Sequence, residues 1–262
     1  MDFTELFSLR GRTALVTGGS RGIGKMIAAG FVAQGATVYI SSRKAEACEK
    51  VAAELGANCH ALPADVSTAT GCSMLAKAFE ATGGPLDILV NNAGAAWGAS
   101  IEEFPESGWD KVMNLNVRSP FFLTKSLLNS LRSATATGSI AKVINIASVD
   151  GLRLSPWDTY SYHASKAALL HLTRRMAARL VSDRIHVTAI APGAFASEMN
   201  RAARDRAGAV AKAIPAGRIG NEKDIAAAAV YLASAAGDYV VGDTLTVDGG
   251  LVHASFGPDI DG

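Results

Sequence analysis

Tyr162 and Lys166 stand four residues apart in the segment Tyr162-His163-Ala164-Ser165-Lys166, which pairs a phenol with an amine. On a helix, side chains at this spacing share one face and lie within about 6 Å of each other. A cation about 5 Å from a phenol favours the phenolate by about 3 kcal/mol at an effective dielectric constant of about 20. We therefore predict that Lys166 lowers the pKa of Tyr162 and that Tyr162 exchanges a proton with a substrate. Tyr160 is rejected as the acid because Ala164 stands four residues after it.

Ser148 is a candidate for holding the reacting oxygen. It ends an apolar run, and at the end of a parallel strand its side chain would project toward a ligand. A hydroxyl aimed at an oxygen that gains negative charge stabilises that charge by donating a hydrogen bond. The alternative is a local role, in which Ser148 caps the turn formed by residues 148–151.

Asn116 is a candidate through its backbone. Pro120, four residues on, removes one helical hydrogen bond and crowds the carbonyl of Asn116. A freed carbonyl needs water or a side chain as partner, so we predict that Asn116 supports a water chain leading protons toward Lys166. A helix bend with no part in the chemistry is the alternative.

A glycine-rich segment, residues 17–24, separates the first apolar run from a helical pattern. Gly18 permits a tight turn, Gly22 a close backbone approach to phosphate, and Gly24 close packing of the next helix. Because a helix N-terminus favours an anion, the segment predicts a dinucleotide pyrophosphate site formed by Gly18, Ser20, Arg21, Gly22, Ile23 and Gly24. The motif lacks the Lys-Ser/Thr ending of a nucleoside triphosphatase, and a glycine turn without a ligand is the alternative.

Ser42 and Arg43 follow the second apolar run, where an NAD-specific site has Asp or Glu. Arg43, joined by Arg21, would bind a 2′-phosphate through charge-assisted hydrogen bonds. We therefore predict NADP(H) rather than NAD(H) as the cofactor. The alternative is that both arginines are solvated surface charges.

The elements that position these residues alternate between strand and helix. Short apolar, β-branched runs recur with longer helical patterns between them, as in a parallel sheet covered on both faces. We predict an α/β, Rossmann-like, doubly wound seven-stranded parallel sheet, and a helix that starts near Asp158 and another over Ser107–Leu131. The predicted strands are Thr13–Thr17, Thr37–Ser41, Cys59–Pro63, Leu86–Asn91, Lys142–Ser148, His186–Ala191 and Thr244–Val247.

Composition excludes several classes of protein. The 262 residues are 49% hydrophobic and 19% charged, which excludes a disordered chain, and a formal net charge of +1 disfavours binding to nucleic acid or an acidic membrane. The longest apolar stretch, Ile225–Ala233, is far shorter than the ~20 residues of a membrane span, and residues 1–12 lack the apolar core of a secretory signal. Three cysteines without CxxC spacing fit a reducing compartment, so we expect a soluble, cytoplasmic protein. The five histidines lack ligand spacing, and no metal site is predicted.

Asn91, Asn92 and Gly94 close the fourth predicted strand. Gly94 would let a nicotinamide approach the backbone. For the two asparagines, holding neighbouring strand ends together is the favoured role, because amides have no useful pKa for proton transfer.

Taken together, these motifs and their order resemble the short-chain dehydrogenase/reductase family over Leu9–Gly250. The matching segments are Thr17–Gly24, Asp65, Asn91–Gly94, Asn116, Ser148, Tyr162 with Lys166, Pro192-Gly193 and Asp248–Gly250. The resemblance implies that Tyr162 is the general acid and base, that Lys166 lowers its pKa and holds the nicotinamide ribose, that Ser148 orients a carbonyl, and that Asn116 supports a proton relay.

The resemblance also implies further cofactor contacts. Asp65 and Val66 would contact adenine, Asn92, Ala93 and Gly94 would line the cofactor, and Pro192 and Gly193 would flank the nicotinamide. Ser197 stands near the position where the family usually has Thr, so a hydroxyl is kept.

The implied reaction is hydride transfer from NADPH to a ketone carbon with protonation by Tyr162, or the reverse oxidation of an alcohol. Residues 91–98, 108–122 and 148–168 are similar to those of bacterial NADPH-dependent 3-oxoacyl reductases, including the rhamnolipid-synthesis type. This similarity implies a 3-oxoacyl thioester on acyl carrier protein or coenzyme A as substrate. Reductases of sugars, polyols and cyclic ketones share the motifs and remain the alternative. A non-catalytic nucleotide sensor is the remote alternative, since such a protein would readily lose Tyr162, Lys166 or Ser148.

The substrate side and the assembly are less sharply defined by the sequence. An apolar substrate pocket is expected from Trp97, Leu152, Trp157, Phe195 and Met199, with core packing as an equal alternative. We expect one domain over residues 1–262, with a lid around residues 194–215 over the carboxyl ends of the strands. An apolar strand at residues 243–250 would leave an open sheet edge, and the family resemblance implies a homotetramer, with a dimer as second choice.

Overall fold

The computed structural model describes residues 3–136, 138–198 and 200–255. Seven strands form one sheet in the order β3-β2-β1-β4-β5-β6-β7, and every pair of neighbours is parallel. The strands are β1 (Thr13–Thr17), β2 (Thr37–Ser41), β3 (Cys59–Ala61), β4 (Ile88–Asn91), β5 (Ala141–Ile146), β6 (Ile185–Pro192) and β7 (Thr244–Val247). The predicted α/β doubly wound fold is confirmed.

The strands form where the sequence is continuously apolar because both faces of the sheet are covered. All six residues of β5 are buried, and so are all four of β4. The strand boundaries differ from those expected by one or two residues at several ends, and two of these differences bear on the argument. The third strand ends at Ala61, two residues before Pro63, which has no N–H to donate to a sheet. The fifth ends at Ile146, so that Ser148 lies beyond the sheet.

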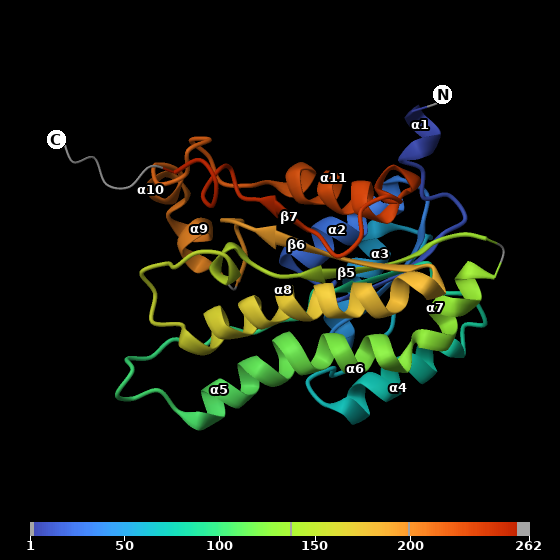
Figure 1. Ribbon diagram of the computed structural model, residues 1–262, viewed down its shortest axis with the longest axis horizontal. Coiled ribbons are helices and arrows are strands. Elements are labelled where there is room, and N and C mark those ends of the chain that lie inside the picture. Colours follow the sequence, from blue (N-terminus) through green and yellow to red (C-terminus); the bar gives the residue numbers. More distant parts are fainter. Residues whose placement is uncertain (1–2, 137, 199, 256–262) are drawn as a thin grey trace.

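Helices cover the sheet in two layers, one above and one below in Figure 1. The upper layer contains α2 (Gly22–Ala33), α3 (Ala45–Leu55) and α11 (Glu222–Ala233), and packs on a core cluster that includes Ile27, Ile40 and Ile225. Helices α2 and α11 approach closely, because a Cβ on Gly30 would lie 2.7 Å from the Cβ of Ala226. The lower layer contains α4 (Ala69–Glu80), α5 (Glu106–Met113), α6 (Ser119–Ser126), α7 (Leu128–Thr135) and α8 (Tyr160–Leu180).

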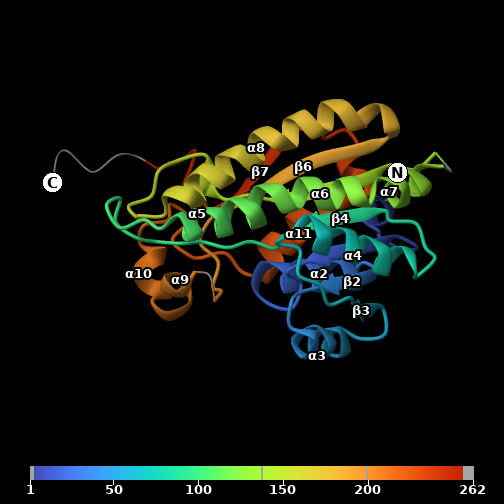
Figure 2. The same ribbon diagram turned by 90° about the horizontal axis from the view of Figure 1, so that it is seen from below.

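The helix expected over Ser107–Leu131 is interrupted. A π-helical turn, η1 (Asn114–Arg118), separates α5 from α6, and the amide of Ser119 donates to the carbonyl of Asn114 five residues back. Pro120 follows in the first turn of α6, where its missing N–H is tolerated. Figure 2 shows α5 and α6 following each other along one line, with α8 lying alongside, and α8 contacts both α5 and the π-helical turn. The bend therefore carries Asn116 toward the start of α8.

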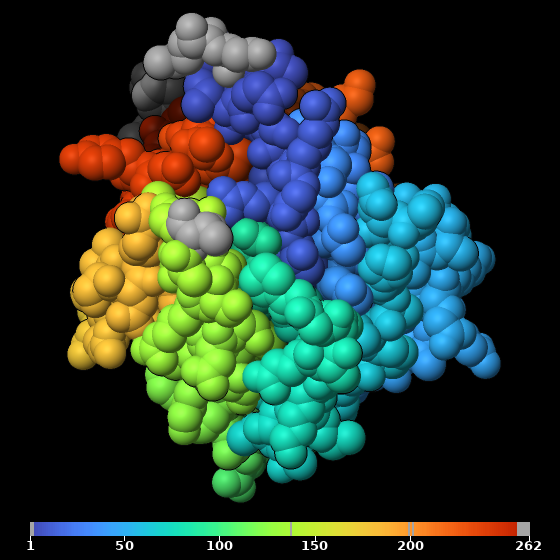
Figure 3. Space-filling model, turned by 90° about the vertical axis from the view of Figure 1, so that its right-hand side faces the viewer, coloured from blue at the N-terminus to red at the C-terminus, as the bar shows by residue number. Residues whose placement is uncertain are grey.

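The two ends of the sheet differ in what covers them. At the carboxyl ends of the strands lie two short helices, α9 (Arg201–Asp205) and α10 (Ala207–Ala211), seen at the left of Figure 1. Figure 3 looks onto the opposite end, where the blue N-terminal segment packs beside the orange-red segment that contains α11. An ion pair lies at this end, between the buried Lys142 at the start of β5 and the partly exposed Asp238, with 2.8 Å between Nζ and Oδ1.

Among the helices that the structure describes, none combines the length and apolar character needed to cross a bilayer. The described residues also contain no cluster of three or more His, Cys, Asp or Glu side chains arranged to hold a metal ion.

Candidate active site

The glycine segment forms the turn between β1 and α2. Gly18 has φ +67°, and a Cβ on it would lie 2.6 Å from Nδ2 of Asn92. A Cβ on Gly24 would lie 2.4 Å from both Asn92 Nδ2 and the carbonyl oxygen of Gly18. Gly22 has φ +52° and faces open space apart from the Cβ of Ser197 at 3.4 Å. The turn therefore needs glycine at 18 and 24 for packing, and leaves the backbone at Gly22 open to a phosphate.

Asn92 holds this turn in place. Its Nδ2 donates to the carbonyl of Thr17 over 2.8 Å, and its backbone amide donates to Oγ1 of Thr17 over 3.0 Å. The amide of Ala93 donates to the same oxygen over 3.0 Å. Asn91 in turn donates to Oδ1 of Asn145 over 2.9 Å. The two asparagines thus join neighbouring strand ends, as the sequence favoured, while a direct contact of Asn92 with a cofactor stays a prediction.

The end of β2 offers a cationic, partly unsatisfied surface beside the turn. Arg21 and Arg43 are both exposed, and neither has an ion pair among the described residues. Ser41 Oγ is buried without a hydrogen-bond partner in the part of the chain that the structure describes, and Ser42 Oγ lies 3.2 Å from Cys48 Sγ. Two exposed guanidinium groups without ion pairs in the described part of the chain fit the 2′-phosphate of NADP(H).

Tyr162 and Lys166 lie in the first two turns of α8 and face the carboxyl end of the sheet. Lys166 Nζ is 5.5 Å from the centroid of the Tyr162 ring, so the predicted shared face is present. The ammonium is buried and donates to the carbonyl of Ile146, at the end of β5, over 2.8 Å. The backbone of β5 therefore fixes the lysine beside the phenol.

Burial shifts both pKa values in the direction that disfavours charge. It raises the pKa of Tyr162 to about 12, against a smaller lowering by the Ser148 hydroxyl. It lowers the pKa of Lys166 to about 8, against a smaller raising by the Asp150 carboxylate. For Tyr162, burial outweighs the lowering influence of Ser148, and a lowering of its pKa by Lys166 stays a prediction.

The position of Ser148 is compatible with both roles considered for it, the cap of a turn and a hydrogen-bond donor to the reacting oxygen. Its Oγ accepts from the amide of Asp150 over 3.1 Å and caps the 3-10 turn η2 (Val149–Gly151). The same hydroxyl is close enough to Tyr162 to lower its pKa. A Cβ on Gly151 would lie 2.7 Å from the backbone of Lys166, so η2 packs directly on α8. The serine and the phenol are thus held on one rigid corner.

Asn116 contributes a side-chain network. Its Oδ1 accepts from the amide of Ala95 over 2.8 Å, and its Nδ2 donates to the carbonyl of Ala95 and to Oγ of Ser165. Ser165 Oγ donates to the carbonyl of Tyr162. A Cβ on Gly94 would meet Asn116 Oδ1 at 3.2 Å and Lys166 Nζ at 3.8 Å. Asn116 thus ties the loop after β4 to α8, and its part in a proton relay stays a prediction.

The remaining expected cofactor residues lie around the same sheet end. Asp65 Oδ1 accepts from the amide of Ser67, and Val66 is buried against the lower core cluster. Pro192 ends β6, and the amide of Gly193 donates to the carbonyl of Val247. Ser197 Oγ accepts a hydrogen bond from the amide of Asn200. The Cβ of Ser197 lies near Gly22, 3.4 Å from the place that a Cβ on this glycine would take.

The expected substrate residues separate into two groups. Leu152 and Trp157 are 39% and 59% exposed on the loop after Ser148. Phe195 is 2% exposed and belongs to the upper core cluster, and Trp97 packs on Gly108 of α5. Phe195 therefore packs inward against Gly220 instead of projecting from a loop, which favours the core-packing alternative for it. Met199 lies outside the described residues.

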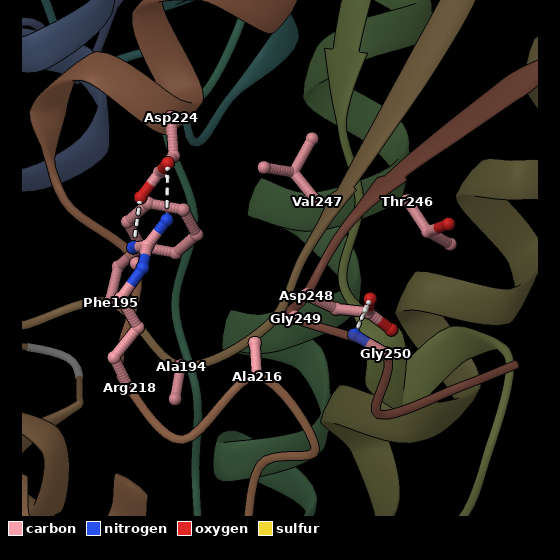
Figure 4. Close-up of a pocket in the computed structure, with 11 residues that line it drawn as sticks. Ala194, Phe195, Ala216, Arg218, Asp224, Thr246, Val247, Asp248, Gly249 and Gly250 are labelled. Atoms are coloured by element: carbon pink, nitrogen blue, oxygen red, sulfur yellow. Dashed lines mark hydrogen bonds and ion pairs between the residues drawn. The ribbon is translucent and has the colours of Figure 1, made fainter. Parts of the chain in front are cut away.

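A separate cavity of about 340 Å³ lies between the segment before α11 and the end of β7 (Figure 4). Arg218 and Asp224 form a two-pronged ion pair on one side, and Asp248 accepts from the amide of Gly250 on the other. Ser148, Tyr162 and Lys166 are not among its lining residues. The cavity is thus distinct from the candidate proton donor.

The sequence analysis assigned no individual role to two residues that shape this site. Thr17 Oγ1 accepts hydrogen bonds from the amides of Asn92 and Ala93. A polar residue at the end of an apolar strand is the sequence feature that could have indicated this role. The Asp150 carboxylate raises the pKa values of both Tyr162 and Lys166. Its place two residues after Ser148 is the sequence feature that could have indicated this role.

Comparisons with known proteins agree with this arrangement over almost the whole chain. A family model described as enoyl-(acyl carrier protein) reductase matches residues 18–252. A rhamnolipids biosynthesis 3-oxoacyl-(acyl-carrier-protein) reductase of Pseudomonas aeruginosa is 48% identical over 250 residues, which cover 94% of this chain and 98% of that protein. A 2-dehydro-3-deoxy-D-gluconate 5-dehydrogenase of Dickeya dadantii is 40% identical over 254 residues, with 93% and 96% covered.

Solved structures give the same result. An active-site complex of RhlG with NADP from Pseudomonas aeruginosa superposes with a TM-score of 0.91 at 47% identity, covering 94% of this chain and 98% of that one. A gluconate 5-dehydrogenase of Burkholderia cenocepacia, in complex with NADP and tartrate, superposes with a TM-score of 0.87 at 35% identity, with 95% and 98% covered.

Proposed function

The chain belongs to the short-chain dehydrogenase/reductase family, and we propose that it is an NADPH-dependent reductase of 3-oxoacyl thioesters carried on acyl carrier protein or coenzyme A. One observation carries the proposal: the half-buried phenol of Tyr162 lies close to the Ser148 hydroxyl and beside the buried cation of Lys166, at the edge of the sheet that also holds the glycine turn. A relative named as a 3-oxoacyl reductase, at 48% identity, supports the substrate class.

The cofactor would be held by this chain's turn and its arginines. Gly22 gives its backbone to the pyrophosphate, and Arg21 and Arg43 bind the 2′-phosphate. NADPH, when bound, supplies the hydride that reduces the carbonyl carbon. A neighbouring structure titled as an NADP complex, at 47% identity, supports this choice of cofactor.

The chain's own residues handle the proton. With a pKa of about 12, Tyr162 is protonated at neutral pH and is ready to donate to the carbonyl oxygen, as reduction requires. Lys166, with a pKa of about 8, is charged at neutral pH, and its field stabilises the phenolate left after donation. Ser148 donates a hydrogen bond to the oxygen as negative charge develops on it.

The surface beside the phenol favours an acyl chain over a sugar. Leu152, Leu154 and Trp157 are 39%, 85% and 59% exposed on the loop that follows Ser148. Exposed apolar side chains that cluster beside a reactive group indicate a surface that an apolar ligand covers. The sugar-acid alternative is supported by the relative named as a gluconate-type dehydrogenase at 40% identity.

A substrate panel separates these functions. NADPH oxidation is followed at 340 nm with an acetoacetyl thioester, a long-chain 3-oxoacyl thioester and a 5-keto sugar acid at equal concentrations. The proposal expects the largest kcat/KM with a thioester, increasing with chain length. If the sugar acid gives the largest kcat/KM, the 3-oxoacyl proposal is wrong and the protein is a sugar-acid dehydrogenase instead.

We propose a mobile lid and a symmetric assembly around this site. The described part of the predicted lid, residues 194–198 and 200–215 with α9 and α10, lies over the carboxyl ends of β6 and β7, and would close over the substrate within a single catalytic domain. Trp109 and Phe121, on α5 and α6, are 41% and 42% exposed, which supports burial against a second copy and a homotetramer. Sedimentation analysis tests this assembly, with a dimer as second choice and a stable monomer as the contrary result.

A cytoplasmic location belongs to the same proposal. Cys48, Cys59 and Cys72 are all free and buried, as in proteins of a reducing compartment. Fractionation of cells that make the protein tests this location.

A further inference from the structure

The imidazole of His163 connects α8 to the loop between η2 and α8, residues 152–159. His163 follows Tyr162 directly and is 16% exposed. Its Nδ1 lies 3.0 Å from the carbonyl oxygen and 3.1 Å from Oγ1 of Thr159, at the end of the loop. Its Nε2 lies 3.1 Å from Oγ and 3.4 Å from the amide of Ser155, at the middle of the loop.

These contacts assign the tautomer of the ring. A carbonyl oxygen can only accept, so Nδ1 carries the proton that is donated to Thr159. A backbone amide can only donate, so Nε2 offers its lone pair to Ser155. Asp150 Oδ1 is 3.9 Å from Nε2, beyond hydrogen-bond reach, and does not set this arrangement. One imidazole thus holds two points of the loop at once.

The loop has few other attachments to the body of the protein. Among the described residues, Arg153 Nη1 donates to the carbonyl of Leu251, and the carbonyl of Asp158 accepts from the amide of Ala99. Between these two points lie Leu154 and Trp157, both strongly exposed. The His163 contact with Ser155 falls in the middle of this span. Tyr160, at the start of α8, also donates to Oδ1 of Asp158 near the end of the loop. Removing the Ser155 contact therefore frees the middle of the loop, which carries Leu154 and Trp157, while its end stays attached.

We propose that His163 is a positioning residue, which clamps the loop of residues 152–159 so that Leu152 and Trp157 form a fixed wall for the substrate's acyl chain. The inference rests on the proposed function for the identity of the ligand. It assigns to His163 no contact with the reacting atoms, because both ring nitrogens are already engaged with the loop.

Paired substitutions test the clamp. Gln places a non-titrating oxygen at the position of Nε2, whereas Asn is one bond shorter and reaches only Thr159. His163→Asn is therefore expected to raise KM for a long-chain 3-oxoacyl thioester about three- to tenfold, the effect of one lost hydrogen bond, with kcat and the Kd for NADPH changed less than about twofold. His163→Gln is expected to restore KM. His171→Asn, at an exposed position two turns along α8, is the matched control and is expected to match the wild type.

A second readout does not depend on turnover. Hydrogen exchange of the peptide that covers residues 149–159 is expected to be faster in His163→Asn and normal in His163→Gln and His171→Asn. Ser155→Ala breaks the same contact from the loop side, and is expected to raise KM and speed exchange even if His163→Asn does not fold. Unchanged exchange and KM in Ser155→Ala, or equal defects in the Gln and Asn variants, would overturn the clamp. Faster exchange in Ser155→Ala without any thioester reduction by the wild type would reject the proposed function and leave the clamp standing.

Discussion

Lys166 Nζ lies 5.5 Å from the centroid of the Tyr162 ring and donates to the carbonyl of Ile146 over 2.8 Å. The lysine is thus anchored by the sheet and not by the phenol. Its charge acts on the phenol through space, and a pKa lowered to about 8 makes this charge sensitive to mild alkali. The two residues therefore have separate functions. Tyr162 stays protonated and can donate its proton to the substrate, and the positive charge of Lys166 stabilises the phenolate that donation leaves.

The first prediction concerns the pH dependence of reduction. Lys166 is charged below about pH 8 and loses its charge as the pH rises through that value, whereas Tyr162, with a pKa of about 12, keeps its proton throughout. We expect kcat for reduction to fall with rising pH, with a midpoint near 8. Lys166→Arg keeps a cation to a much higher pH, so its profile is expected to lack this fall. A midpoint that stays near 8 in the arginine variant would assign the fall to another group.

The second prediction concerns cofactor choice. Arg43→Ala removes a guanidinium that has no other ion pair among the described residues. A hydrogen bond to a charged group contributes about 1.5–3 kcal/mol, so Kd for NADPH is expected to rise about 10- to 100-fold while Kd for NADH stays the same. Arg174→Ala, at an exposed position on α8, is the control and is expected to change neither value. Equal losses for both cofactors would show that Arg43 supports the fold instead.

The third prediction concerns the glycine turn. A Cβ on Gly24 would lie 2.4 Å from Asn92 Nδ2 and from the carbonyl of Gly18, so Gly24→Ala must displace the turn. Overpacking of this kind costs about 1–3 kcal/mol, and we expect a lower Tm and at least a tenfold weaker affinity for NADPH. Gly208→Ala, where a Cβ would meet open space, is the control, and we expect it to have the wild-type Tm and the wild-type affinity for NADPH. A Gly24→Ala variant with normal Tm and affinity would mean that the turn adapts freely.

The fourth prediction concerns acid stability at the N-terminus of α11. Hydrogen bonds from Arg218 and from the amide of Asn221 lower the pKa of Asp224 from 3.8 to about 2. A carboxyl whose pKa is lower in the folded state stabilises that state above its unfolded pKa, and this stability is lost as the pH falls from about 4 to about 2. Asp224→Asn also removes the capping box with Asn221, so the free energy of unfolding at pH 7 is expected to fall by about 1–2 kcal/mol.

Denaturant titrations at several pH values check this. The difference between wild type and Asp224→Asn is expected to shrink as the pH falls from 4 to 2. Asp110→Asn, an exposed carboxylate on α5 without an ion pair among the described residues, is the control. If the difference in the free energy of unfolding between wild type and Asp224→Asn does not change with pH, the loss of stability comes from the capping box alone and not from the charge of Asp224.

Much of this structure was predictable because local chemistry determines it. The seven strands follow from continuous apolar runs, and the turn after β1 follows from glycines that a close backbone approach and positive φ require. The shared face of Tyr162 and Lys166 follows from helical spacing alone.

Long-range contacts set what the sequence could not reveal. Burial raises the pKa of Tyr162, and the surroundings of this part of α8 depend on how the turn after β5 packs back on the helix at Lys166. Phe195 turned inward because Gly220, 25 positions later in the chain, leaves room for its ring. The interruption near Pro120 was expected as a bend, but the π-helical turn precedes the proline, at Asn114–Arg118.

The most direct measurement is a single-turnover assay of NADPH oxidation at 340 nm with Tyr162→Phe and Tyr160→Phe. Tyr160 lies two residues earlier on α8, is 38% exposed and donates to Asp158, so its variant controls for the loss of a phenol from the same helix. Because general acid catalysis contributes about 10²–10⁴-fold, Tyr162→Phe is expected to lose at least about 100-fold in rate, with Kd for NADPH within about twofold of wild type. Tyr160→Phe is expected to react at the wild-type rate. A Tyr162→Phe enzyme that binds NADPH and turns over normally would contradict the account.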